Sequence, residues 1–310
     1  MNTPAVSIVM ACRNAERFLA SSVESILNQI CADFEFILID DASEDRSSEL
    51  LAEYARHDAR IVLSRNESNL GLTRSLNLGL ERARGLYIAR MDADDIAMPT
   101  RLERQRQYLD AHPEVFLVGT AYEYIDEAGN TLGSHTPPTA PARVAKTLPK
   151  INCIAHPSIL FRNETGLRYR SKFQYAQDYD LYLRLLSEGK SLVNLEEPLL
   201  QYRQHAESVT LSQAAKQALF AEKARAFHRQ RLADRQDRYD TWDPRDITDR
   251  DLTQSDDPVA LRAEIKASLS LKRYAEARAL IRRHATLHGL RDGYTLYWPW
   301  SLFKQYLARD

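Results

Sequence analysis

The sequence predicts an α/β fold with a mostly parallel, doubly wound sheet that has a mixed part, followed by a helical carboxyl-terminal region. Short apolar, β-rich runs alternate with helical patterns over residues 5–91. Beyond Pro99 the pattern becomes mixed, and after about residue 210 it is almost wholly helical. Parallel sheets of this kind bind ligands beyond the carboxyl ends of their strands, so the residues there are the first candidates for a site.

The first half alternates strands and helices. Apolar residues such as Leu72, Leu76 and Leu80 recur at helical spacing, Asn14 is placed to cap the first helix, and Gly85 is placed to end the third. The expected strands are 6–12, 34–40, 60–65 and 86–91, and the expected helices are 14–30, 43–56 and 70–85.

The second half is less regular. The expected elements are a polar helix at 100–111, a strand pair at 115–126 and 131–135, a proline-rich loop at 137–149, a strand at 156–162, a helix at 177–190 stopped by Gly189, and a last strand at 198–205. A helical hairpin is expected at 259–287, after a polar connection near 241–258. We predict a main domain over residues 1–210 and a helical extension over residues 211–310.

Composition excludes several classes of protein. The 310 residues include 42 basic and 43 acidic side chains, and the formal charge of -1 gives no reason to expect nucleic acid as a partner. No apolar run approaches the roughly 20 residues that span a bilayer. The three cysteines, Cys12, Cys31 and Cys153, have no metal-ligand spacing and indicate structural thiols in a reducing compartment. We therefore expect a cytoplasmic protein with at most peripheral membrane contact.

Three carboxylates follow an expected buried strand in "YIARMDADDIAMP", at Asp92, Asp94 and Asp95. Like charges at a strand end repel unless a cation lies among them, and oxygen ligands favour magnesium, manganese or calcium. An EF-hand is excluded, because Ile96 and Ala97 would occupy its ligand position 5 and its glycine position 6. The alternative is that the aspartates only cap the helix entered at Pro99.

A second acidic strand end, "FILIDDASED", places Asp40 and Asp41 near the same edge of the sheet. Acidic residues after such strands accept hydrogen bonds from a ribose or a base, although a helix cap is the simpler role. The sequence has neither a GxxxxGK(S/T) loop nor a GxGxxG after its first strand. A nucleoside diphosphate held by a metal fits these observations together.

At this point the chain resembles the inverting, nucleotide-sugar-dependent glycosyltransferases of family two, which have the GT-A fold. The resemblance covers about residues 5–210 and rests on the order of six segments, "VSIVMACRNAERFLASSVESILNQ", "FEFILIDDASED", "NLGLTRSLNLGL", "ARGLYIARMDADD", "HPSILFR" and "QDYDLYLRL". It implies that Asp41, with Asp40 beside it, meets the uracil or ribose of the donor. It also implies that Asp92, Ala93 and Asp94 form the metal-binding DXD element, with Asp94 the direct ligand and Asp95 in support.

The resemblance also assigns the chemistry of transfer. Asp178, at the start of the helix "QDYDLYLRL", corresponds to the base that deprotonates the acceptor, with Asp180 as the runner-up and a simple helix cap as the structural alternative. The family often has an acid directly before the base, where this chain has Gln177.

Three further residues complete the expected site. Arg203 and His205 correspond to a segment that reaches the donor diphosphate, although a solvated loop pair is the alternative. His156 falls where the acceptor side begins, or is a hydrogen-bonded core histidine. Residues 294–303 gather five aromatic side chains that fit a peripheral membrane contact or packing on the main domain.

The resulting prediction is an inverting transferase that uses Mn²⁺ or Mg²⁺. It moves one sugar from a uridine-based nucleotide sugar to a glycan or lipid-linked glycan, in cell-surface polysaccharide or lipopolysaccharide biosynthesis. Processive synthases of the family carry a QxxRW element that is absent here. Two alternatives remain, a nucleotidyltransferase and a non-catalytic module that binds nucleotide sugars or carbohydrates.

Overall fold

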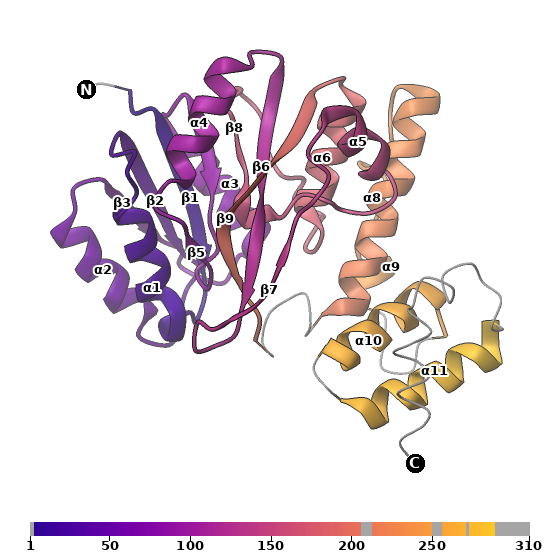
Figure 1. The fold of residues 1–310 in the computed structure, drawn as a ribbon. Coiled ribbons are helices and arrows are strands. Elements are labelled where there is room, and N and C mark those ends of the chain that lie inside the picture. The colour runs from indigo at the N-terminus through magenta and orange to yellow at the C-terminus, as the bar shows by residue number, and fades with distance from the viewer. Residues whose placement is uncertain (1–2, 206–212, 250–255, 271–272, 289–310) are drawn as a thin grey trace. The chain divides into compact units, whose positions relative to one another are not determined.

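The computed structural model describes residues 3–205, 213–249, 256–270 and 273–288 (Figure 1). Contacts group the chain into two compact units, Met1–His205 with Ala221–Pro244 and Ala206–Phe220 with Arg245–Asp310. The first unit contains the sheet and the site predicted from the sequence. The division at residue 210 stays a prediction, and the aromatic segment at 294–303 lies outside the described residues.

In the part of the chain that the structure describes, a nine-stranded sheet has the order β3-β2-β1-β4-β8-β6-β9-β5, with β7 paired to β6. The strands are β1 Val6–Cys12, β2 Phe34–Asp40, β3 Ile61–Arg65, β4 Tyr87–Arg90, β5 Ile96–Ala97, β6 Val115–Ile125, β7 Thr131–His135, β8 Leu160–Arg162 and β9 Ser191–Arg203. Pairing is parallel among β1, β2, β3 and β4, whereas β8 runs antiparallel to both β4 and β6. The predicted parallel half and mixed half are both confirmed.

Helices cover the two faces of the parallel half (Figure 1). Those of the first unit's sheet region are α1 Glu16–Leu27, α2 Ser47–His57, α3 Leu72–Arg82, α4 Arg101–Ala111, α5 Pro141–Thr147, the 3₁₀ helix η1 His156–Ser158 and α6 Gln177–Ser187. Beyond them come α8 Ala214–Asp234, α9 Arg245–Thr248, α10 Pro258–Ser270 and α11 Tyr274–His288. The last two contact each other, as the predicted helical hairpin requires.

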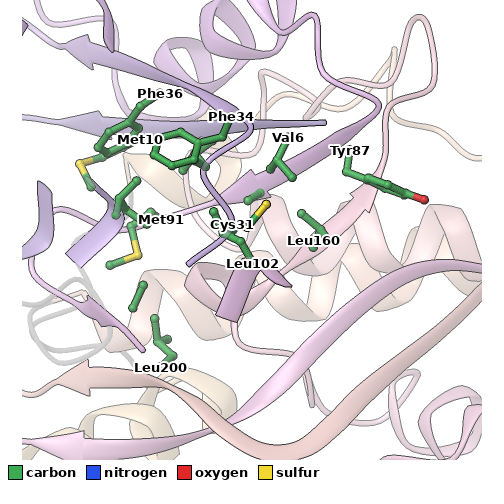
Figure 2. Close-up of a cluster of buried hydrophobic side chains, with 14 of the residues drawn as sticks. Val6, Met10, Cys31, Phe34, Phe36, Tyr87, Met91, Leu102, Leu160 and Leu200 are labelled. Atoms are coloured by element: carbon green, nitrogen blue, oxygen red, sulfur yellow. The ribbon is translucent and has the colours of Figure 1, made fainter. Parts of the chain in front are cut away.

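Alternation along β1 divides the core between the two faces. Met10 belongs to a buried cluster with Phe36, Met91 and Leu102, which Figure 2 shows among its members. Val9 points to the other face, where a Cβ added to Gly79 of α3 would lie 2.4 Å from a Val9 methyl carbon. Successive strand residues face opposite sides of a sheet, so one fully apolar strand serves both helix layers.

Two residues that were predicted to cap or end helices, Asn14 and Gly85, have different roles in the structure. Asn14 is not the cap of α1, because it adopts a left-handed backbone with φ 51° and its side-chain oxygen accepts a hydrogen bond from the Glu44 backbone N–H at 2.9 Å. The free N–H groups of α1 are satisfied instead by the loop after β2, through Ser47 Oγ and an Asp45 carboxylate oxygen. Gly85 does not end α3, which stops at Arg82.

Three expected boundaries are wrong. The predicted loop at 137–149 contains α5, and the predicted strand at 156–162 begins as η1. The last strand starts at Ser191, well before Pro198, and its long parallel pairing with β6 has register shifts on both sides of Ala121. This pairing is non-local, which is why the local pattern did not reveal it.

Cys12, Cys31 and Cys153 are free thiols, as predicted. Within the residue ranges given above, none of the helices combines the length and apolar character needed to cross a membrane.

Candidate active site

Three carboxylates converge just beyond the carboxyl end of β4. One oxygen from each of Asp92, Asp94 and Asp95 lies within 4.8 Å of the others. The side chains of Asp92 and Asp94 are 29% and 32% exposed, whereas Asp95 is 1% exposed. The short strand β5 follows at once and pairs with β9, so the cluster is fixed between two strands of the sheet.

Each carboxylate has a different neighbour. Asp95 Oδ1 accepts a hydrogen bond from the Arg203 backbone N–H at 2.8 Å, while its buried Oδ2 has no hydrogen-bond partner in the described chain. Asp94 Oδ2 lies 2.9 Å from His205 Nε2, and Asp92 forms an ion pair with Arg90. The cluster therefore keeps free acceptor capacity that the fold does not use.

Electrostatics opposes full ionisation of this cluster. Burial, followed by the charges of Asp94 and Asp92, raises the pKa of Asp95 well above its ordinary value. Burial also raises the pKa of Asp92, with Asp94 adding to the shift and Arg90 opposing it. A divalent cation would relieve the repulsion, and an all-oxygen donor set with an unused buried oxygen suits Mg²⁺ or Mn²⁺. The residues present fit such an ion.

Arg203 and His205 both contact the aspartate cluster. The Arg203 guanidinium donates to the backbone oxygen of Asp94 at 2.7 Å and to that of Asp126 at 3.0 Å, and it lies over the Phe18 ring. His205 packs against the same ring, with centroids 5.3 Å apart. Most of the Arg203 donors serve the fold, so its contact with a diphosphate stays a prediction, as does that of His205.

Asp40 and Asp41 lie at the end of β2 and are both buried. Asp41 accepts hydrogen bonds from Asn66 Nδ2 at 2.7 Å and from the backbone N–H groups of Leu70 and Gly71 at 2.8 Å each. Asp41 therefore organises the loop before α3. Asp40 accepts from the Ser43 N–H at 3.0 Å and lies 3.3 Å from Arg65. Their contact with a ribose or base is not tested by these bonds and stays a prediction.

Asp178 occupies the first turn of α6 and is partly exposed. Its Oδ2 accepts a hydrogen bond from Asn152 Nδ2 at 2.8 Å. Burial raises the pKa of Asp178, while hydrogen bonds from the Tyr179 backbone and Asn152 oppose the rise. The preceding Ala176 has a left-handed backbone with φ 55°, a conformation that a residue with a Cβ adopts only under strain.

Asp180, the runner-up for the base, has a structural role. It is fully buried and forms ion pairs with Arg170 and Arg184. Arg170 also binds Asp237, which extends the network to residues after α8. Asp178 is therefore the carboxylate of α6 that is partly exposed, and its role as the base stays a prediction.

His156 is 8% exposed and lies 2.7 Å from the Tyr169 hydroxyl through its Nε2. Burial, and then the charge of Arg90, lower its pKa well below the ordinary value, so the ring is neutral. Its assignment to the acceptor side stays a prediction. Ala93, between the two DXD aspartates, is buried at 9% exposure.

Sequence reasoning missed two residues that bind predicted site carboxylates, Arg90 beside Asp92 and Asn152 beside Asp178. Arg90 ends the strand "YIAR", and a charged residue in a strand read as buried was the available signal. Asn152 had no such signal, because its contact with Asp178 spans 26 residues of irregular chain.

Comparison with known proteins gives the family. The protein-family model described as "Glycosyl transferase family 2" matches residues 7–166 of this chain. The chain belongs to this family. Among its relatives, an uncharacterized glycosyltransferase of Methanocaldococcus jannaschii is 37% identical, over 71% of this chain and 78% of the relative.

Other relatives of this family 2 glycosyltransferase carry biosynthetic names. The O-antigen biosynthesis glycosyltransferase WbnJ of Escherichia coli is 34% identical, over 68% of this chain and 84% of WbnJ. Among solved structures, S. aureus TarS 1-349 in complex with UDP has a TM-score of 0.57 at 16% identity, over 95% of this chain and 93% of that one. The likeness to TarS supports the predicted GT-A fold, and the relatives confirm a glycosyltransferase with homologues in polysaccharide biosynthesis.

Proposed function

We propose that this chain is an inverting, metal-dependent glycosyltransferase that moves one sugar from a UDP-sugar to a glycan or lipid-linked glycan. The observation that carries the proposal is the pairing of two kinds of carboxylate. Asp92, Asp94 and Asp95 form a cluster suited to a cation, while Asp178 is a separate carboxylate presented by the first turn of a helix. The similarity to WbnJ, a relative named for O-antigen biosynthesis, supports the class of acceptor.

The residues divide the work of transfer. A cation held by Asp94 and Asp92, with Asp95 in support, would offset the negative charge on the departing diphosphate. Asp178 accepts the proton of the acceptor hydroxyl as that oxygen attacks the sugar from the face opposite the leaving group. Asn152 orients Asp178 by donating to its Oδ2. Asp41 holds the loop before α3 in place beside the donor.

Product analysis tests this proposal against a nucleotidyltransferase. We expect incubation with UDP-sugars and Mn²⁺ to release UDP, at a rate that depends on the metal. Release of pyrophosphate would instead support nucleotidyl transfer. A variant carrying Asp94→Asn should lose metal-dependent release, while Arg84→Gln, near the amino ends of β1 and β2, serves as the matched control.

Binding measurements test the site without turnover. If the cation bridges the aspartates and the diphosphate, Mn²⁺ and UDP should each tighten the binding of the other by the same factor. Calorimetric titrations without such coupling would contradict the metal assignment. Coupled binding with no hydrolysis or transfer across donors and acceptors would favour a binding module over an enzyme.

A further inference from the structure

A stretch of the chain without acidic residues contains three exposed cations that the fold does not use. Residues 128–163 include no aspartate or glutamate, but they include four lysine and arginine residues. Arg162 has a structural role, because its guanidinium donates to three backbone oxygens. The other three are exposed and have no ion-pair or side-chain hydrogen-bond partner among the described residues. We call these three side chains the basic face: Arg143, Lys146 and Lys150.

The basic face is built by α5 and the turn that follows it. Its members are three and four residues apart, the spacing that puts side chains on one side of a helix. The turn continues the helical path, because the Ile151 N–H donates to the Thr147 backbone oxygen at 3.1 Å. Val144 and Leu148, on the other side, are fully buried, and α5 packs against β9. Burial of that side directs the three cations to solvent.

Hydrogen bonds join this segment to α6, which carries Asp178 (Figure 1). The Tyr179 hydroxyl donates to the Leu148 backbone oxygen at 2.6 Å, and Asn152 Nδ2 donates to Asp178 Oδ2 at 2.8 Å. Consecutive Cα atoms are about 3.8 Å apart, so the Cα of Lys150 lies within about 8 Å of the Cα of Asn152. The basic face therefore begins next to the residue that binds the proposed base.

Asn194 of β9 closes the same segment into a fixed loop. Its Nδ2 donates to the Pro138 backbone oxygen at 2.8 Å and to the Cys153 backbone oxygen at 3.2 Å. The two ends of the segment are thus held at one point of the sheet, and the chain between them presents its cations in a preset arrangement. A preset site loses less conformational freedom when a ligand binds.

An apolar side chain stands at the end of the basic face. Ile151 directly follows Lys150 and is 59% exposed. A single exposed isoleucine is ordinary on a protein surface, but this one lies between a cation and Asn152, the partner of Asp178. Cations beside an exposed apolar group match a ligand that has an anionic head and an apolar tail. A soluble acidic sugar would leave the apolar side chain without a contact.

We propose that the basic face binds the diphosphate of a lipid-linked glycan acceptor, with Ile151 against the start of its lipid chain. The inference rests on the proposed function, because the ligand is an acceptor only if Asp178 receives a proton from it. Arg143 matches phosphate oxygens through paired hydrogen bonds, and the two lysines add positive charge. The proposal narrows the acceptor from any glycan to one that carries a lipid diphosphate.

Calorimetric titration of the full chain tests binding without turnover. The probes are pyrophosphate and geranyl diphosphate, in buffer with EDTA so that no cation occupies the donor side. Wild type should bind geranyl diphosphate more tightly than pyrophosphate, and raising KCl from about 0.05 M to about 0.5 M should weaken both. Neutralising the basic face should weaken both by about 10-fold or more. That variant combines Arg143→Gln, Lys146→Gln and Lys150→Gln.

Two further variants separate the charges from the apolar contact. Ile151→Ser should weaken geranyl diphosphate by about 3- to 10-fold and leave pyrophosphate unchanged. A matched control neutralises one exposed arginine on each of α2, α3 and α4 and should leave both affinities unchanged. Every substituted side chain is exposed, so circular dichroism should show wild-type folding in all variants. The control combines Arg56→Gln, Arg82→Gln and Arg104→Gln.

The outcomes separate this inference from the function on which it rests. Equal affinities in wild type and the neutralised variant would overturn the inference, while UDP release from UDP-sugars would still support the transferase. Binding that needs the basic face, in a protein that releases no UDP from any UDP-sugar, would refute the transferase and leave a diphosphate site. Dependence on the basic face for binding phosphatidylglycerol vesicles, with no preference for geranyl diphosphate over pyrophosphate, would assign the face to a membrane surface and overturn the acceptor.

Discussion

Asp178 and Asp180 lie two residues apart on α6, and we expect their substitutions to have opposite effects. Asp180→Asn removes a fully buried carboxylate from ion pairs with Arg170 and Arg184. Asp178→Asn changes a partly exposed carboxylate that accepts one hydrogen bond from Asn152. Asp180→Asn should lower the free energy of unfolding and leave turnover intact. Asp178→Asn should abolish turnover and leave the free energy of unfolding nearly unchanged.

The structure sets the size of each effect. Breaking a buried ion pair by removing one partner costs about 3–5 kcal/mol. Arg170 keeps Asp237 as a partner, so the lower end, about 3 kcal/mol, applies to Asp180→Asn. For a domain of this size, that corresponds to a fall in Tm of roughly 6–12 °C. Asp178→Asn loses a charge at a helix amino end, worth about 1 kcal/mol or less.

Thermal unfolding followed by circular dichroism measures the first effect, and UDP release at low temperature, normalised to folded protein, measures the second. Asp180→Asn should keep most of its activity per folded molecule, and Asp178→Asn should lose at least about 100-fold in turnover. A stable, inactive Asp180→Asn beside an active Asp178→Asn would refute the assignment of both residues.

Three further predictions concern backbone and metal. Ala176→Gly should raise the free energy of unfolding by about 0.5–1 kcal/mol in denaturant titrations, because Ala176 has φ 55° and glycine adopts that backbone without strain; an equal or lower midpoint would contradict this. Gly85→Ala should lower the free energy of unfolding by about 1–3 kcal/mol, since the new Cβ would lie 2.5 Å from the Ser7 backbone nitrogen. A variant with wild-type stability would contradict this, because it would show that the backbone shifts without cost. The pKa of Asp95 is raised by burial and its neighbours, so metal-free protein loses stability as pH rises through that pKa. The gain in Tm on adding Mn²⁺ with UDP should therefore be larger at about pH 8 than at about pH 5, and a pH-independent gain would count against a metal at Asp95.

Local sequence was informative where a short pattern decides the structure. The strands of the parallel half and the helix that begins at Gln177 followed from periodicity, and the family segments placed the carboxylates at their ends. The pattern failed for β9, whose pairing with β6 is set by residues more than 70 positions away. It also failed for Asn14, because the loop after β2 supplies the hydrogen bonds that cap α1.

The sequence by itself determined the order of the elements, the family and the set of candidate carboxylates. The family resemblance ranked Asp178 ahead of Asp180 as the base, but the local sequence gave no physical reason for that order, because both acids stand at the start of one helix. The tertiary structure supplied a physical difference between them, because Asp180 is buried in ion pairs with Arg170 and Arg184, and Arg170 is itself paired with the distant Asp237. It likewise placed the buried guanidinium of Arg90 beside Asp92. Charges act through space, so their partners become visible only when the chain is folded.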